Sequence, residues 1–361
     1  MRHFPGMLDM AENVMTRRNF LAQSAMVAAG VIGYQSGAGR PIVRTLARDI
    51  PPAELSSGAV LFHEHLSMHY PLTNALAEKQ GAAAPSHFSD DIALMVEETK
   101  AAGKDGVSCI VDGGHPDMDR NIDALKRIAA ETPVHIVASG GYYMQRYYPP
   151  EMASKTADQI AAELAREAKA QRLGAFGEIG QQGGELTDDE RKVFTAVAKA
   201  QVLTGLPIFT HNAYTGARTT NPPVPRDAAL RQLDVLEAAG ARPPNVAIGH
   251  VCCLDEPSAD IAKQIAKRGA FVGFDRVTIP IVPDARRVTM ILALIDAGFA
   301  GNLLLSSDFS SSRSLKKNGG AGLAQTVTVF GKMLSDAGVK PDVLRTILVD
   351  NPKRFLSFIP K

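Results

Sequence analysis

The chain of 361 residues has no tryptophan and only three cysteines. An odd number of cysteines without short, regular spacing argues against a fold held together by disulfides. Cys252 and Cys253 are adjacent, and adjacent cysteines rarely bond to each other because of disulfide geometry. Cys109 lies in the apolar run 107–111, where a buried thiol is expected, although a link to one of the other two is an alternative.

The sequence also lacks an excess of charge of either sign. Lysine and arginine number 39 against 38 acidic residues, which gives a net charge of +1. This balance does not favour nucleic acid or an anionic membrane surface as a partner. With 45% hydrophobic and 21% charged residues, the composition is that of an ordinary globular protein.

The N-terminal residues have the features of an export signal rather than of the fold. Arg17 and Arg18 precede an alanine-rich apolar stretch, and small residues follow it. This order is typical of a signal peptide, and the arginine pair resembles the twin-arginine export signal. We expect a signal over residues 1–39 and a mature chain over residues 40–361 that works in the periplasm without stable membrane insertion. The alternatives are uncleaved anchoring and a chance arginine pair before an amphipathic helix.

The remaining chain alternates between short apolar runs and longer segments with helical periodicity. The expected strands are residues 59–63, 107–112, 133–138, 174–178, 206–210, 245–249, 270–274 and 302–306. The expected helices are residues 90–102, 119–131, 156–172, 188–204, 226–239, 257–268, 284–297 and 320–337. Eight such units without an intervening linker predict a single-domain (β/α)₈ TIM barrel. An open, doubly wound sheet is the alternative.

Side chains that can bind a metal stand at the ends of several expected strands. His63 and His65 follow the first apolar run, and residues two apart on a strand point to the same side. Active sites of such barrels lie at the C-terminal ends of the strands, so we expect the strand-end side chains to meet. The other candidates of this kind are Glu178, His211, His250 and Asp308.

Four imidazoles and two carboxylates form a ligand set that suits Zn²⁺, although Mn²⁺ and Co²⁺ accept the same ligands. Six ligands are too many for one tetrahedral Zn²⁺, and they suit two divalent ions bridged by a carboxylate and a water. Any one strand-end histidine could equally be a hydrogen-bonded structural residue, but five strand ends with such residues indicate a site. His115 follows the second strand, and it is either a structural histidine or a substrate contact.

The pattern resembles the phosphotriesterase family of the amidohydrolase superfamily over essentially the whole mature chain. The resemblance is carried by residues 58–66, 140–143, 210–211, 248–250, 273–276, 305–308 and 350–356. It implies that His63, His65 and Asp308 hold a buried metal. It also implies that His211 and His250 hold a more exposed one.

One position departs from the common pattern of that family. Many members carry a carboxylated lysine at the end of the fourth strand, whereas this chain has Glu178. A carboxylated lysine is chemically a carboxylate, so a glutamate can bridge two ions through a shorter arm. We therefore expect metal loading that does not depend on bicarbonate. The alternative is a strand-end acid paired with a nearby arginine.

The resemblance implies hydrolysis by a metal-bridged hydroxide, with Asp308 taking up the proton and the exposed metal polarising the substrate oxygen. Tyr142 and Arg276 are candidates for contacts with the substrate. Aromatic packing and an ion pair with a loop acid are the alternative roles of these two residues. We expect a small carboxylic ester or lactone as substrate, mainly because of Arg276, and a phosphotriester is the alternative.

Two other classes of function compete with this interpretation. An amidase or deaminase could use the same barrel, but deaminase relatives usually use one metal and lack the acid at Glu178. A catalytically silent barrel could act as a binding protein, but it has no reason to keep all six ligands. A homodimer is possible, and the sequence specifies neither an interface nor the substrate.

Overall fold

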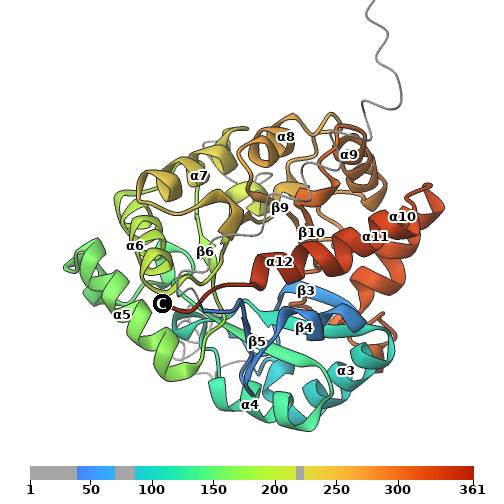
Figure 1. Cartoon of the computed structure of the whole chain (residues 1–361), viewed down its shortest axis with the longest axis horizontal. Coiled ribbons are helices and arrows are strands. Elements are labelled where there is room, and N and C mark those ends of the chain that lie inside the picture. Colours follow the sequence, from blue (N-terminus) through green and yellow to red (C-terminus); the bar gives the residue numbers. More distant parts are fainter. Residues whose placement is uncertain (1–38, 70–85, 217–222) are drawn as a thin grey trace, which may run out of the picture. The chain divides into compact units, whose positions relative to one another are not determined.

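The computed structural model describes residues 39–69, 86–216 and 223–361, and it confirms the predicted (β/α)₈ barrel. Figure 1 shows the strands in the interior and the helices around them. The predicted signal lies outside the described residues except for Gly39, so export to the periplasm stays a prediction. Within the described ranges, no helix combines the length and the hydrophobicity needed to span a bilayer.

Eight parallel strands pair in the order of the chain. They are β3 (Ala59–Glu64), β4 (Val107–Asp112), β5 (His135–Gly140), β6 (Ala175–Gly180), β7 (Ile208–His211), β8 (Val246–Ile248), β9 (Phe271–Phe274) and β10 (Leu303–Leu305). Each lies within about two residues of an expected strand, because parallel strands buried on both faces are apolar throughout. The sequence pattern therefore located every strand of the barrel.

The barrel closes between its last strand and its first. The backbone N–H of His63 donates to the Ser306 hydroxyl at 3.0 Å. The backbone N–H of Asp308 donates to the His63 carbonyl at 3.2 Å. These bonds join β3 to the segment that follows β10, so residues from both ends of the chain meet at one seam.

Seven helices of the outer layer match the expected segments. They are α3 (Ile92–Lys104), α4 (Ile122–Glu131), α5 (Ala157–Gln171), α6 (Asp188–Thr204), α7 (Ala228–Ala238), α8 (Asp260–Lys267) and α9 (Asp284–Asp296). Thr156 and Thr187 begin α5 and α6 with capping boxes, in which side chains satisfy the free backbone N–H groups of the first turn.

The last expected helix, residues 320–337, is shorter than predicted. Gly319 and Gly322 have φ angles of +83° and +73°, which a right-handed helix does not permit. The regular structure begins with a π-helical turn, Thr326–Gly331, and continues as α10 (Lys332–Asp336). Two further helices, α11 (Pro341–Arg345) and α12 (Asn351–Leu356), end the barrel and were not predicted.

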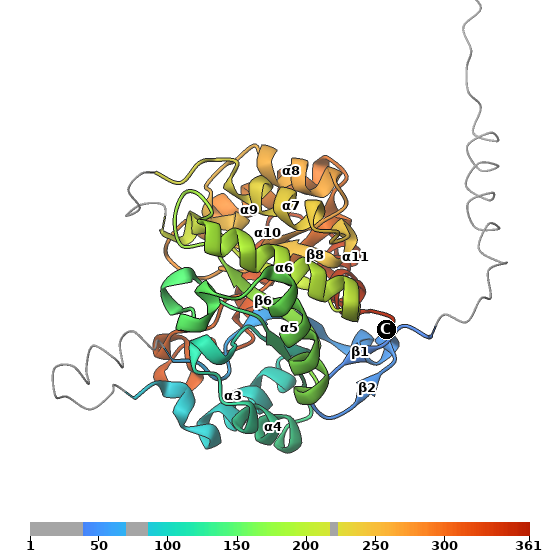
Figure 2. The ribbon, with the colours of Figure 1, turned by 90° about the vertical axis from the view of Figure 1, so that its left-hand side faces the viewer.

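A short antiparallel pair precedes the barrel and was also not predicted. It consists of β1 (Val43–Arg44) and β2 (Asp49–Ile50), which are too short to show an alternating pattern. The backbone N–H of Ile42 donates to the carbonyl of Phe358 at 2.9 Å, which ties this pair to the C-terminal segment. Figure 2 shows β1, β2 and the C-terminus together at one end of the barrel.

The barrel interior is filled by apolar side chains and is not a pore. Phe62, Phe209 and Phe271 are buried inside it, and Phe355 of α12 packs its ring against Phe62 and Phe271 at centroid distances of 6.2 and 5.5 Å. A second and larger apolar layer separates the strands from the helices. The floor of the barrel is therefore closed, and the space for a site lies at the C-terminal ends of the strands.

Candidate metal centre

The six predicted ligands meet at the C-terminal ends of five strands. None has more than 5% of its surface exposed. His63, Glu178 and His211 lie on strands, and His65 directly follows β3. His250 and Asp308 lie just beyond β8 and β10, with φ angles of +57° and +49°. Such left-handed conformations are uncommon outside glycine, and they turn both side chains into the site.

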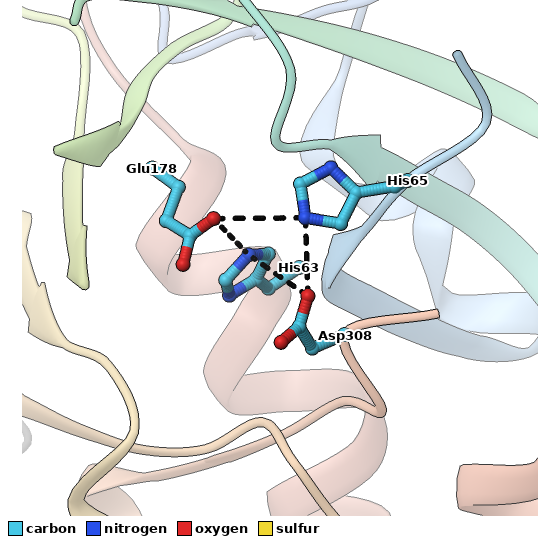
Figure 3. Close-up of side chains that lie close together, drawn as sticks. All are labelled: His63, His65, Glu178 and Asp308. Atoms are coloured by element: carbon cyan, nitrogen blue, oxygen red, sulfur yellow. Dashed lines mark ion pairs between the residues drawn. The ribbon is translucent and has the colours of Figure 1, made fainter. Parts of the chain in front are cut away.

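Four of these residues form a first cluster, which Figure 3 shows at close range. The His65 Nε2 atom lies 3.1 Å from Asp308 Oδ1 and 3.6 Å from Glu178 Oε2. The His63 Nε2 atom lies 3.4 Å from the same Glu178 oxygen. One ligand atom from each residue lies within 4.8 Å of the others, so the four can surround one cation.

A second cluster is built on the other oxygen of Glu178. The His250 Nε2 atom lies 2.7 Å from Glu178 Oε1 and 2.9 Å from His211 Nδ1. The same Glu178 oxygen also contacts His211 Nδ1. Because Oε2 faces the first cluster and Oε1 the second, Glu178 lies where a bridging carboxylate is required.

The donor set fits divalent cations on chemical grounds. His63 Nε2 is buried without a hydrogen-bond partner among the described residues, although a buried polar nitrogen normally has one. The Nδ1 atom of His211 and the Nε2 atom of His250 lie only 2.9 Å apart, an arrangement that a bound cation explains. Imidazole and carboxylate ligands together suit Zn²⁺ and related ions.

Asp275 orients one histidine from each cluster. Its Oδ2 atom lies 2.9 Å from His63 Nδ1, and its Oδ1 atom lies 3.0 Å from His250 Nδ1. The backbone N–H of His250 also donates to Asp275 at 2.7 Å. These contacts leave both Nε2 atoms directed at the clusters, as is usual for histidines that bind metals.

The electrostatics favour protons on His63, His65 and His250 when no metal competes, whereas burial lowers the pKa of His211. Burial lowers the pKa of His250, but Asp275 and Glu178 outweigh it and raise that pKa to about 10. In the same way, Asp308 and Glu178 raise the pKa of His65 to about 9 against the effect of burial. Burial raises the pKa of Glu178, but the surrounding imidazoles hold it well below its ordinary value. Metal binding must therefore release protons.

The residues expected to contact the substrate differ in their surroundings. Arg276 is at the site, where its Nη1 donates to Asp308 Oδ2 at 2.7 Å. Tyr142 packs its ring against Tyr148, at a centroid distance of 6.0 Å. The phenol near the ligands comes from the next residue, since Tyr143 Oη lies 3.3 Å from His211 Nδ1. This loop follows the end of β5, where strand alternation no longer decides which residue faces the site.

Glu64 lies between the two histidines of the first strand and points away from them, as alternation predicts. Its carboxylate accepts hydrogen bonds from the backbone N–H groups of Ser307 and Phe309, at 2.9 and 2.8 Å, and from the Ser307 hydroxyl at 2.8 Å. These bonds fix the residues on both sides of Asp308. This contact could not be predicted from the sequence, because Ser307 lies 243 positions after Glu64.

The three cysteines are buried and unpaired. Cys109 lies inside the barrel, as its apolar neighbours predicted. His115 is also buried, and both of its ring nitrogens are bonded within the protein, so it does not face a substrate.

Comparisons with known proteins agree with this arrangement. The sequence model described as the phosphotriesterase family matches residues 42–356. A relative from Escherichia coli (strain K12), named phosphotriesterase homology protein, is 30% identical over 74% of this chain and 89% of its own length. Its crystal structure, described as complexed with phosphate in the active site, matches 83% of this chain and 99% of its own with a TM-score of 0.71 and 28% identity.

Another relative is named N-acetyltaurine hydrolase. The protein from Danio rerio is 27% identical over 88% of this chain and 98% of its own length. Both relatives are matched over nearly their full length, so the likeness extends over the whole barrel and is not confined to isolated motifs.

Proposed function

Because this chain belongs to the phosphotriesterase family, whose members are metal-dependent hydrolases, we propose that it uses two divalent ions to hydrolyse a small carboxylic ester or lactone. One observation carries the proposal: Glu178 presents one oxygen to His63 and His65 and the other to His211 and His250. A shared carboxylate between two ligand clusters suits a binuclear centre, and Zn²⁺ is the ion that these ligands suit best.

Two ions held by these residues would supply activated water and polarise the substrate carbonyl. Asp308 is the residue best placed to take the proton from the attacking water. Burial raises its pKa, but Arg276 lowers it below the ordinary value, so the carboxylate is ionised and can accept. Asp308 then gives the proton to the alcohol oxygen of the ester, or to the ring oxygen of the lactone, as the acyl C–O bond breaks.

Arg276 has a donor left for the substrate. Its Nη1 binds Asp308, but its buried Nε has no hydrogen-bond partner among the described residues. A buried donor without a partner is costly, and an oxygen of an ester or lactone would satisfy it. Tyr142, the other candidate, packs against Tyr148, while the phenol of Tyr143 lies beside His211.

Hydrolysis of an N-acyl amide is a second candidate. It is favoured by the relative named N-acetyltaurine hydrolase, whose sequence is matched over 98% of its length. Phosphotriesters form a third substrate class on the same barrel. All three reactions place attacking water against an acyl or phosphoryl centre, so the same residues can serve each of them.

The test begins with the metal content of gently purified protein, followed by turnover of lactones, aryl esters, N-acyl amides and phosphotriesters. We expect about two divalent ions per chain and the highest kcat/KM with a lactone or aryl ester. A higher kcat/KM with an amide would favour the second candidate. A chain that binds no ion, even after incubation with Zn²⁺ or Mn²⁺, would contradict the proposal and favour a silent barrel.

The variant Asp308→Asn separates an enzyme from a binding protein. We expect kcat to fall by about 100-fold or more, because the proton acceptor is lost. The exposed Asp260 offers a matched control, Asp260→Asn, which should leave kcat unchanged. Equal kcat values for the two variants would exclude Asp308 as the proton acceptor.

A further inference from the structure

We propose that His115 and Asp117 form a positioning pair that sets the distance between Glu178 and Tyr143, and so maintains the second metal cluster. This inference rests on the proposed function, because it assumes that Glu178 bridges two ions. His115 follows β4, and neither it nor Asp117 is among the groups of side chains that could hold a metal ion.

The pair lies in the loop after β4 and connects Glu178 on β6 with Tyr143 in the loop after β5. One ring nitrogen of His115, Nε2, lies 2.9 Å from the backbone carbonyl oxygen of Glu178. The other, Nδ1, lies 2.7 Å from Asp117 Oδ1. Asp117 Oδ2 in turn accepts from the backbone N–H of Tyr143 at 2.7 Å. The backbone of Glu178 and that of Tyr143 are thus joined through two buried side chains.

A direct backbone hydrogen bond also joins the segment of Glu178 to that of Tyr143, so the contacts form a closed loop. The N–H of Gly180, two residues after Glu178, donates to the carbonyl of Tyr143 at 2.7 Å. The N–H of Glu178 donates to the carbonyl of Gly113 at 3.1 Å. Both backbone polar groups of Glu178 are therefore held by the segment that contains His115, and not by a neighbouring strand alone.

Glu178 needs this support because regular pairing is interrupted around it. The pairing of β6 with β7 passes from Phe176 to Ile179 with a register shift, so Glu178 lies in the irregular part of the strand. An irregular residue is not fixed by the sheet ladder, and its side chain direction depends on other contacts. The carbonyl bond from His115 supplies such a contact.

The pair joins the backbones of Glu178 and Tyr143, and the side chains of these two residues both contact the Nδ1 atom of His211. The carboxylate of Glu178 contacts His211 Nδ1, and the phenol oxygen of Tyr143 lies 3.3 Å from the same nitrogen. A shift of either backbone would change how His211 is presented. The second cluster has only Glu178, His211 and His250, whereas the first has three ligands besides Glu178, so the second is the more sensitive.

His115 does not contact the substrate in this arrangement. Its side chain is fully buried, and the Asp117 side chain has 1% of its surface exposed. A carbonyl oxygen only accepts hydrogen bonds, so the Nε2 atom of His115 donates to it. No ring nitrogen is left for a ligand, and the action of His115 runs through Glu178.

Two substitutions of His115 separate its two contacts. The amide nitrogen of glutamine can take the place of Nε2, and that of asparagine the place of Nδ1. His115→Gln keeps the donor to Glu178, whereas His115→Asn loses it. The matched control is His135→Asn, since His135 is half-buried at the opposite end of the barrel. Each full-length protein is loaded with Co²⁺ and analysed for metal content, visible absorption and release to a chelator.

We expect about two Co²⁺ per chain for the wild type, His115→Gln and His135→Asn, and about one for His115→Asn. When excess Co²⁺ forces a second ion into His115→Asn, that ion should leave about 10- to 100-fold faster, the usual effect of losing a residue that orients a ligand. Unchanged content and release in His115→Asn would overturn the inference, as would equal losses in the asparagine and glutamine variants. A wild type that binds no Co²⁺ would instead overturn the proposed function, and the inference with it.

Asp117 provides the comparison if His115→Asn does not fold. Asp117→Asn keeps an acceptor for the Tyr143 N–H and a polar partner for the ring, whereas Asp117→Ala keeps neither. We expect the asparagine variant to retain both ions and the alanine variant to lose the second. Retention of both ions by Asp117→Ala would contradict the inference.

Discussion

Asp275 illustrates, at the scale of a single residue, how one buried carboxylate can serve both halves of the site. It binds Nδ1 of His63 and Nδ1 of His250, so it fixes the tautomer and the ring orientation of a ligand from each cluster. Burial raises its pKa, but the two histidines lower it far below the ordinary value, which keeps the acceptor ionised. A partner of this kind affects metal binding almost as strongly as a ligand does.

The variant Asp275→Asn should therefore weaken the binding of both ions by about 10- to 100-fold. The amide has nearly the same shape, but its NH₂ group cannot accept the hydrogen bond that one of the two imidazoles donates. Competition with a chelator gives the dissociation constants. The exposed Asp260 provides the control substitution Asp260→Asn. Loss of only one ion would show that Asp275 serves one cluster.

The pKa values of the ligands predict how metal binding depends on pH. His65 and His250 have pKa values raised from 6.5 to about 9 and about 10, so they hold protons that a metal must displace. Affinity for Zn²⁺ should therefore rise between pH 6.5 and 10. Over the same range the metal-free protein should lose stability. A histidine whose pKa is raised by folding stabilises the folded state while it is protonated, and this contribution is lost as the pH rises through the raised pKa. Titration calorimetry and denaturant unfolding at several pH values test both trends.

The sequence predicted the ligands of the site but not the residues that hold them in place. His63, His65 and the four later ligands were predicted because each stands at a strand end, and the structure places all six together. Their binding of metal stays a prediction. Asp275 also follows an expected strand, but its role depends on contacts with His63 and His250, which lie 212 and 25 residues away in the chain. Asp117 lies in a loop, and its contact with Tyr143 spans 26 residues. Tyr143 could not be told from Tyr142 because the two are adjacent in a loop.

At the scale of elements, two successive residues of the first barrel strand, β3, face the barrel interior, although simple alternation would place them on opposite sides. Phe62 packs inside the barrel, and the next residue, His63, also faces inward, with its ring 5.1 Å from that of Phe209. The pairing of β3 with β4 shifts in register between Leu61 and Glu64, which allows this. The apolar run predicted the strand, but its register depends on the neighbouring strand and cannot be predicted from the run.

Glu64 belongs to the same strand and clamps the segment after β10. The variant Glu64→Gln places an NH₂ group against backbone donors, so one or more of them loses its acceptor. We expect the free energy of unfolding to fall by about 1–3 kcal/mol, as measured in denaturant. The control Glu97→Gln removes a carboxylate whose side chain is 73% exposed and should change little. An unchanged stability of Glu64→Gln would mean that the clamp is dispensable.

At the scale of the whole molecule, the ligands come from β3 and the residue after it, from β6 and β7, and from the segments after β8 and β10. Bound ions would therefore connect much of the barrel. Anything that binds only the folded state stabilises it, by about 2.7 kcal/mol per site at a ligand concentration 100 times Kd. We therefore expect a chelator to lower Tm and excess Zn²⁺ to restore it. Identical Tm values with and without chelator would argue against tight binding.

The seam between the first and last strands has a consequence for how the protein is made. His63 and Ser306, which meet there, are 243 residues apart in sequence. A growing polypeptide thus holds two histidines of the first cluster early in synthesis but gains the aspartate only near the end. A product of translation that stops before Asp308 cannot assemble that cluster, so the first metal can be captured only after most of the chain has been made.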